Sequence, residues 1–99
     1  MQVEKFLRNG DSLEVNVGAI KTPEELHHLL FDAFQFPEYY GNNWDAFDQC
    51  LQEIDVPGII QIDNFKVLNS CLPQEAEFLS RCLEDFNEYH EPKIVIRIR

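Results

Sequence analysis

The stretch Pro37-Glu-Tyr-Tyr-Gly-Asn-Asn-Trp-Asp-Ala-Phe-Asp-Gln-Cys-Leu51 joins an aromatic turn to an acidic amphipathic helix. Its glycine can adopt a positive φ without steric cost, so a tight bend is expected at Tyr39-Tyr40-Gly41. The side chain of Asn42 or Asn43 can cap the helix that follows, and Asp45 lies where the helix dipole favours a negative charge. The other segments of the chain are expected to support this loop and helix.

Helical spacing divides the residues of this helix between two faces. An apolar stripe, with Cys50 at its edge, is formed by Trp44, Phe47, Leu51 and Ile54. The opposite face carries the acids and amides Asp45, Asp48, Gln49 and Gln52. The first face is expected to be buried, and the second is free to present carboxylates and amides to a partner.

The composition predicts one folded, acidic domain. A chain of 99 residues can bury a single core, so residues 1–99 are expected to form one domain. Apolar residues make up 44% of the chain, which favours a folded protein over a disordered acidic tail. The net charge of −10 disfavours direct contact with nucleic acid or an anionic membrane and favours a cationic partner, although solubility alone can explain such a charge.

The sequence also bears on location and cofactors. It lacks a secretion signal and any run near the roughly 20 apolar residues that span a membrane, so a cytoplasmic protein is expected. The cysteines, odd in number and without Cys-x-x-Cys spacing, are expected to be reduced, with Cys50 and Cys82 in or near the core. The three histidines show no metal-ligand spacing, so neither a metal nor a cofactor is expected.

Enzymatic activity is not expected. A nucleophile pair of Cys50 and His27 can be imagined, because a thiolate needs a neighbouring base. However, acidic surroundings would raise the pKa of the thiol, and the helical pattern places Cys50 near the core. The sequence contains no glycine-rich phosphate loop, nucleophile elbow or metal motif.

The first third of the chain predicts a hairpin and a helix. Val3–Arg8 and Ser12–Val17 are extended runs separated by Asn9-Gly10, a dipeptide favoured in two-residue hairpin turns. Thr22-Pro-Glu-Glu has a capping hydroxyl, a proline at the first helical position and acids in the first turn. A helix should begin there and end before Pro37.

The last part of the chain predicts two strands separated by helices. Ile59–Ile62 is expected to form a strand covered on both faces, followed by a short helical turn at residues 65–69. Pro73 opens a second long helix, and Ile94–Ile98 is a β-branched closing strand. The complete alternation predicts an α/β protein with a small, mainly parallel sheet, right-handed crossovers and helices packed against the sheet.

The Pro37–Leu51 segment closely resembles the signature of the barstar family of ribonuclease inhibitors. The resemblance rests on Pro-Glu-Tyr-Tyr-Gly, Asn and Asp-Ala in fixed spacing, and the register is ungapped from Leu26-His27 onward. It implies a small, three-layer-like barstar fold around a mainly parallel three-stranded sheet. The Met1–Arg8 segment precedes the usual start of the family and can add an N-terminal edge strand.

The resemblance also implies a function. It predicts a bacterial immunity protein or antitoxin, a monomer that binds a basic nuclease 1:1, most directly a ribonuclease, and occludes its active site. The acidic loop and helix would occupy the positions of substrate phosphates. The residues of this chain that match the binding residues of the family are Tyr39, Gly41, Asn43, Trp44 and Asp45. Without the resemblance, Asp45 alone would be interpreted as a helix-dipole acid.

Two substitutions depart from the family pattern. Gln49 stands where the family presents its dominant carboxylate, and Asp48 stands where it has a tryptophan, so the negative charge has moved about 100° around the helix. Trp44 replaces an aliphatic contact residue and could face a partner instead of the core. An acidic contact on the last long helix corresponds to Glu84 or Asp85. These departures predict a target nuclease other than barnase; the alternative is an acidic interaction module for a basic partner that is no nuclease.

Overall fold

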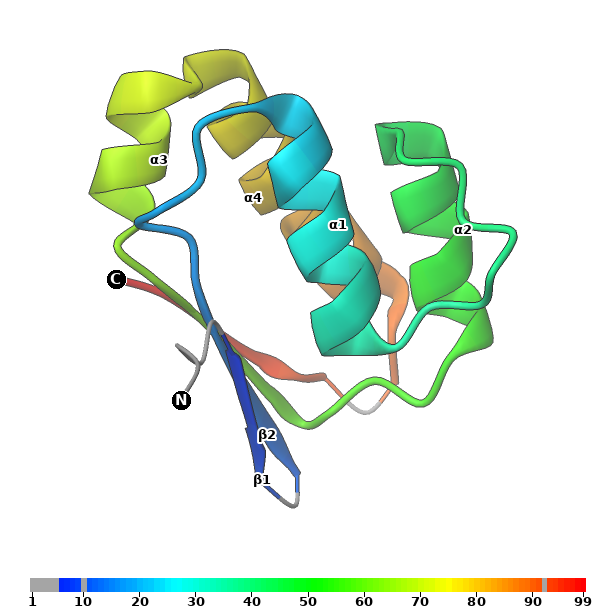
Figure 1. Ribbon diagram of the computed structural model, residues 1–99. Helices are drawn as coiled ribbons and strands as arrows, with labels where there is room; N and C mark the ends of the chain where they lie inside the picture. Colours follow the sequence, from blue (N-terminus) through cyan, green and yellow to red (C-terminus); the bar gives the residue numbers. More distant parts are fainter. Residues whose placement is uncertain (1–5, 10, 92) are drawn as a thin grey trace.

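The computed structural model describes residues 6–9, 11–91 and 93–99, and Figure 1 shows how the elements are arranged. Side chains are described from residue 11 onward. The helices and strands in this part of the chain are β1 (Phe6–Asn9), β2 (Ser12–Asn16), α1 (Pro23–Phe34), α2 (Trp44–Glu53), β3 (Ile59–Asp63), α3 (Phe65–Cys71), α4 (Pro73–Tyr89) and β4 (Val95–Ile98).

The four strands form one sheet in the order β1-β2-β3-β4. Strands β2, β3 and β4 are parallel, and β1 pairs with β2 in the antiparallel direction. Helices α1 and α2 lie in the connection from β2 to β3, and α3 and α4 lie in the connection from β3 to β4. The predicted parallel three-stranded sheet with helices packed against it is therefore confirmed, and β1 is the additional edge strand.

The predicted hairpin is confirmed, but its turn lies one residue later than expected. Asn9 is the last residue of β1 and pairs with Ser12, so it belongs to the strand and not to the turn. Asp11 explains the shift, because its carbonyl and carboxylate accept hydrogen bonds from Ile59 and Gly58 at 3.0 and 3.3 Å. The turn is thus fixed by the neighbouring strand. Residues 3–5 of the predicted first strand lie outside the described residues.

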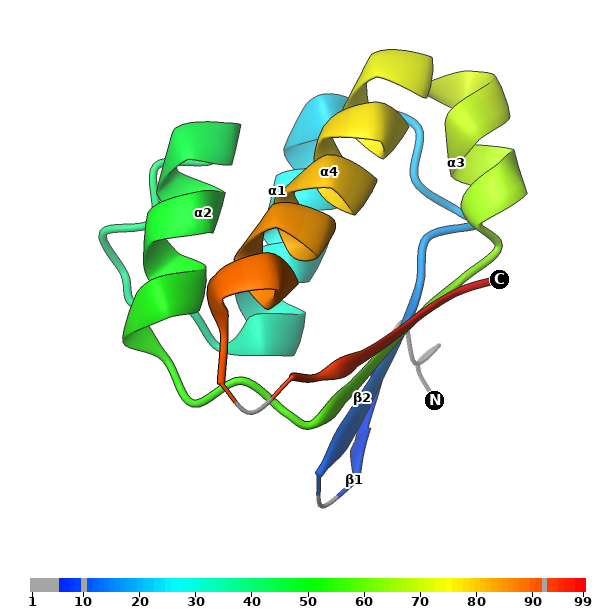
Figure 2. The ribbon, with the colours of Figure 1, turned by 180° about the vertical axis from the view of Figure 1, so that it is seen from behind.

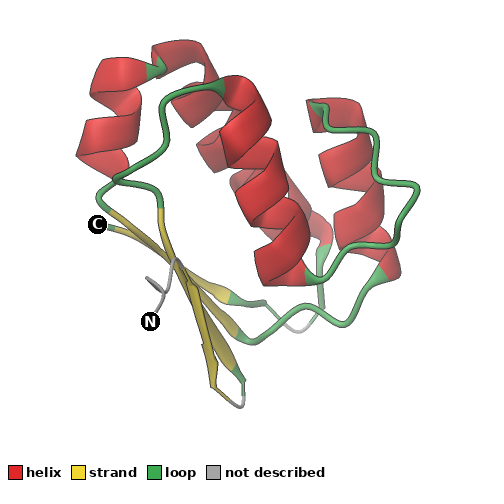
Figure 3. Ribbon diagram, viewed as in Figure 1, coloured by secondary structure: helices red, strands yellow, loops and turns green. Residues whose placement is uncertain are grey.

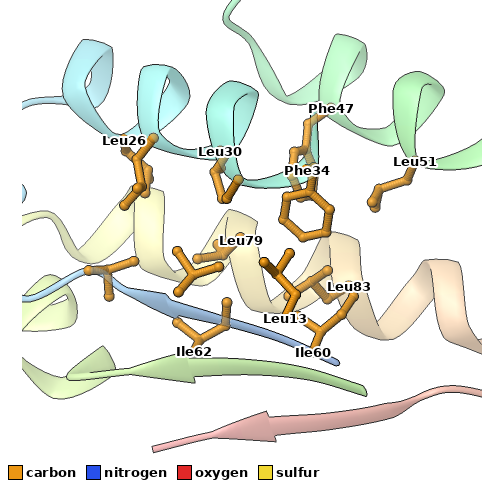
Figure 4. Packing of buried hydrophobic residues seen from close by; sticks show 14 of the residues in the cluster. Leu13, Leu26, Leu30, Phe34, Phe47, Leu51, Ile60, Ile62, Leu79 and Leu83 are labelled. Carbon is orange, nitrogen blue, oxygen red and sulfur yellow. The ribbon is translucent and has the colours of Figure 1, made fainter. Parts of the chain in front are cut away.

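The helices lie on one face of the sheet, as Figures 1 and 3 show and as the view from behind in Figure 2 confirms. Figure 4 shows Leu13 on β2 and Ile60 and Ile62 on β3 pointing toward them, and all three side chains are fully buried. Gln61 lies on the opposite face and is also buried; its amide donates to the Asp63 carboxylate at 3.0 Å. The centre of β3 is therefore buried on both faces, as predicted, although the described helices cover only one.

The core lies between the sheet and three helices, and Figure 4 shows its side chains converging. Those labelled on the helices are Leu26, Leu30 and Phe34 of α1, Phe47 and Leu51 of α2, and Leu79 and Leu83 of α4. The predicted apolar stripe of α2 is confirmed at its centre, where Cys50 is buried and not at the edge. Trp44 and Ile54 are only half-buried, because they lie at the two ends of the helix.

The predicted helix boundaries agree closely with the structure. The Thr22 hydroxyl accepts the Glu25 amide hydrogen at 3.1 Å, and Pro23 is the first residue of α1. Helix α1 ends at Phe34, before Pro37 as predicted, and Gln35 closes it in the left-handed region with a φ of 58°. The short turn predicted at residues 65–69 extends to Cys71 as α3. Among the described helices, none combines the length and the apolar character needed to cross a bilayer.

We expect Phe47→Ala to lower the free energy of unfolding by about 3–5 kcal/mol, because it removes a fully buried ring and leaves a cavity. The ring of Phe47 packs edge-on against Phe34 and Phe36, so two neighbouring contacts are lost as well. Urea denaturation followed by circular dichroism measures the change. Val67→Ala on α3, where the side chain is 46% exposed, should stay within about 0.5 kcal/mol of the wild type. Equal losses for the two variants would contradict this account of the core.

Candidate functional site

The loop between α1 and α2 is held in place by Tyr40. This side chain is buried among aromatic rings, with its centroid 4.9 Å from that of Phe36 and 6.2 Å from that of Phe31. Its hydroxyl is hydrogen-bonded to Nδ1 of His27 on α1, with 2.6 Å between the two atoms. Tyr40 is therefore part of the hydrophobic core. The loop is therefore fastened to α1 both by apolar packing and by a polar contact.

His27 is a buried titratable group within this junction. Its side chain is 3% exposed, and burial lowers its pKa below the usual 6.5, while Glu75 and Glu24 act in the opposite direction. The hydrogen bond of its Nδ1 goes to Tyr40 and not to Cys50. Burial and, to a smaller extent, Glu53 raise the pKa of the Cys50 thiol. Neither group is arranged as the imagined nucleophile pair would require.

The turn into α2 differs from the prediction at one residue. The positive φ belongs to Asn42, at 56°, and not to Gly41. Asn43 is the capping residue: its side-chain oxygen accepts the Ala46 amide hydrogen at 2.7 Å, and its side-chain amide donates to the Gly41 carbonyl at 3.2 Å. Asparagine tolerates the left-handed region better than most residues, so two consecutive asparagines can share the turn and the cap.

Trp44 packs against α4, which the sequence could not specify. Its indole N–H donates to the Glu75 carboxylate at 2.9 Å, and its ring stacks against Phe78 with centroids 6.1 Å apart. A further ring contact, at 4.6 Å, is made with His27. The side chain is half-buried, so it closes the junction of three helices and still exposes part of its surface. A role for Trp44 in partner binding stays a prediction.

Several of the predicted binding residues lie on the surface. The side chain of Tyr39 is 66% exposed, and its hydroxyl donates to the carboxylate of Glu53, which raises the pKa of the phenol. Asp45 and Gln49 are exposed, and Asp48 is half-buried. Because Glu53 is the last residue of α2, the Tyr39 contact ties the loop that precedes α2 to the far end of this helix.

Helices α2 and α4 enclose a hollow of about 710 Å³. Asp45 and Asp48 line it from α2, and Asp85 lines it from α4. Gln49 and Glu84 are exposed but are not among its lining residues. The structure therefore brings Asp85, and not Glu84, together with the two aspartates of α2.

Phe86 falls within the apolar 3–4 spacing of the last long helix, but the sequence did not single out Phe78 and Tyr89, which also line this hollow. The residues of α4 that contribute to it are Phe78, Cys82, Asp85, Phe86 and Tyr89. They recur every three or four residues beside the buried stripe of Ala76, Leu79 and Leu83, and this second stripe is the signal that could have revealed them. Within residues 11–91 and 93–99, no group of three or more His, Cys, Asp or Glu side chains is arranged to hold a metal ion.

The comparisons with known proteins agree with the loop, the helix and the fold. The family model described as "Barstar (barnase inhibitor)" matches residues 11–99, so β1 precedes the matched segment. "Putative ribonuclease inhibitor YrdF" of Bacillus subtilis (strain 168) is 36% identical over 76 residues, which cover 74% of this chain and 84% of that protein. The similarity therefore extends well beyond the Pro37–Leu51 segment.

The lowered pKa of His27 predicts that stability depends on pH. The unfolded chain binds a proton near pH 6.5 more readily than the folded protein does, so the free energy of unfolding should fall as pH drops from about 7.5 to about 5.5. Urea denaturation across this range measures the effect. His27→Gln should reduce the slope, whereas His28→Gln, at a side chain that is 78% exposed, should preserve it. An NMR titration that places the pKa of His27 above 6.5 would contradict the prediction.

Proposed function

Because this chain belongs to the barstar family of barnase inhibitors, we propose that it is a stoichiometric inhibitor of a ribonuclease. The inhibitor covers the active site of its target with the loop and helix that run from Tyr39 to Gln49. The observation that carries this proposal is the combination of an exposed tyrosine and aspartate carboxylates on one firmly held loop and helix. Inhibition requires only occupation of the site, so the protein itself needs neither catalysis nor a cofactor.

Charge supports this mode of action. Ribonuclease active sites hold phosphates with arginine, lysine and other hydrogen-bond donors, and carboxylates can form charge-assisted hydrogen bonds with the same groups. Asp45 is in the first turn of α2, where the cap at Asn43 and the buried Tyr40 fix the backbone. A carboxylate on a fixed backbone loses little conformational freedom on binding. The net charge of −10 also favours association with a basic surface.

The target nuclease differs from barnase in this proposal. Gln49 is neutral, although it stands where other members of the family present their dominant carboxylate. The neighbouring Asp48 lines the hollow beside α4. A target matched to this chain must place its cations opposite Asp45 and Asp48. The inhibitor acts 1:1 in the cytoplasm of the bacterium that makes it, as an immunity protein or antitoxin, and so protects that cell from the nuclease.

Substitutions should separate the contact residues from their neighbours. Asp45→Ala and Tyr39→Ala should each weaken binding of the ribonuclease that co-purifies with the protein by about tenfold or more, the effect of losing one central contact. Asp48→Ala should weaken binding more than Gln49→Ala does. Inhibition constants from an RNA-cleavage assay titrated with each variant measure these effects.

The matched control for these substitutions is Glu14→Ala, which removes an exposed carboxylate from the opposite face of the sheet and should leave inhibition unchanged. All variants should keep the thermal stability of the wild type to within a few degrees. Wild-type inhibition by every variant would show that another surface binds the target. Tight binding to a basic partner without any ribonuclease activity would instead support the acidic interaction module.

Salt should slow formation of the complex. The field of exposed carboxylates is screened over about 8–10 Å at physiological ionic strength, so the association rate should fall as sodium chloride is raised. The dissociation rate should change much less, because it depends on short-range contacts. Stopped-flow measurements with the co-purifying ribonuclease test this, and an association rate independent of salt would argue against electrostatic attraction.

A further inference from the structure

The strand β4 forms one edge of the described sheet, and it pairs with β3 alone. The N–H groups of Val95 and Arg99 donate to carbonyls at and just before β3, at 2.8 Å each. Because alternate residues of a parallel strand direct their N–H and C=O groups to opposite sides, the residues between these two point away from β3. The outward backbone groups of β4 are therefore those of Ile96 and Ile98.

The residue that precedes β4, Ile94, already has a partner on this edge. The side-chain oxygen of Asn87 on α4 accepts the Ile94 N–H at 2.8 Å, and the side-chain amide of Asn87 donates to the Ile94 carbonyl at 3.0 Å. One side chain thus forms the two bonds that a neighbouring strand would form. At Ile96 and Ile98, no hydrogen bond from any other described residue reaches the outward groups. The edge is therefore open to a further strand from Ile96 onward.

The side chains along this edge alternate between apolar and basic. Ile96 and Ile98 follow the register of the buried isoleucines of β3 and lie on the helix side of the sheet, where Ile98 is 39% exposed. Arg97 lies on the opposite face, and both Arg97 and Arg99 are exposed. Residues 93–99 contain three cations and no acid, although the chain has a net charge of −10. A strand added here would meet apolar side chains on one face and cations on the other.

The two arginines are available to an incoming chain. Neither Arg97 nor Arg99 forms an ion pair with another described residue. The carboxylate of Asp63, on the same face of β3, accepts the side-chain amide of Gln61 instead. Lys93, by contrast, donates to two carbonyls near the end of α4 and is used there. Carboxylates of an added strand can therefore pair with both arginines without breaking a contact between described residues.

A second copy of this chain does not suit the edge. Two β4 strands that pair around a twofold axis run antiparallel, and residues on the same face then lie opposite one another. The arginines of the two strands would lie opposite or beside each other, and like charges in such positions destabilise a sheet. Each copy also has a net charge of −10, which adds repulsion at longer range. The charge of the edge therefore calls for an acidic partner.

We propose that the edge of β4 binds an extended peptide segment in which acidic residues alternate with branched apolar residues. The backbone of the segment pairs with the free groups of Ile96 and Ile98 and so continues the sheet. Its apolar side chains pack beside these isoleucines, and its carboxylates lie beside Arg97 and Arg99, because successive side chains of a strand point to opposite faces. Figures 1 and 2 place the C-terminal end of β4 on the opposite side of the molecule from α2, so this site is independent of the proposed ribonuclease surface.

A synthetic peptide and the free protein test this proposal. Acetyl-Glu-Val-Glu-Val-Glu-Val-amide is titrated into ¹⁵N-labelled protein, and hydrogen exchange of the backbone amides is followed by NMR. We expect saturable protection of the Ile96 and Ile98 amides, with a dissociation constant on the order of 1 mM for a short segment that must be ordered and forms few exposed ion pairs. The matched controls are the same peptide methylated on its backbone nitrogens, and the scrambled acetyl-Glu-Glu-Glu-Val-Val-Val-amide, which has the same charge without the alternation. Neither should protect these amides.

Two variants of exposed arginines sharpen the test. Arg97→Gln should weaken binding of the alternating peptide about threefold, the effect of losing one exposed ion pair. Arg81→Gln, on α4, should leave binding unchanged. Equal binding of either control peptide, protection centred on another segment, or wild-type affinity in Arg97→Gln would each overturn the proposal. A dimer in sedimentation whose Ile96 and Ile98 amides are protected without peptide would also overturn it, because a second copy would then occupy the edge.

Discussion

The hydrogen bond between His27 and Tyr40 is the contact on which the arrangement of the loop depends. Both side chains are buried, and a polar group inside an apolar junction must find a partner or destabilise the fold. Because the hydroxyl of Tyr40 is hydrogen-bonded to Nδ1 of His27, the loop is fastened to α1 at the aromatic cluster. The loop then turns the neighbouring Tyr39 outward and starts α2 at Trp44. Burial of one tyrosine thus determines the exposure of the next.

Much of the fold could be predicted because its signals are local. These signals depend only on neighbours in the sequence: the cap at Thr22, the prolines that begin α1 and α4, and the spacing of the leucines. The errors have tertiary causes. The hairpin turn is displaced because Asp11 is hydrogen-bonded to Gly58, which immediately precedes β3 and lies 47 residues away in the sequence. The positive φ falls on Asn42 because Asn43 uses its side chain to cap α2 and to hold the Gly41 carbonyl.

The candidate site could be predicted only in part for a similar reason. Helical periodicity indicates which residues of α2 share a face, but it does not indicate which helix lies beside that face. Trp44 is paired with Glu75, 31 residues further along the chain, and Asp48 faces the same hollow as Asp85. The choice between Glu84 and Asp85 likewise depends on how α4 is rotated against α2. Such relations arise from the packing of two elements, and the periodicity of one helix does not identify the helix that packs against it.

The arginines of the closing strand β4 affect how charge is distributed over the molecule. Arg97 on β4 and Arg99 just beyond it are exposed, and Figures 1 and 2 place this end of the chain on the opposite side of the molecule from α2. The separation of these arginines from the carboxylates of α2 contributes to the dipole moment of the molecule along that direction. In the potential of the basic ribonuclease proposed as the target, this moment would turn the molecule so that α2 faces the partner before contact.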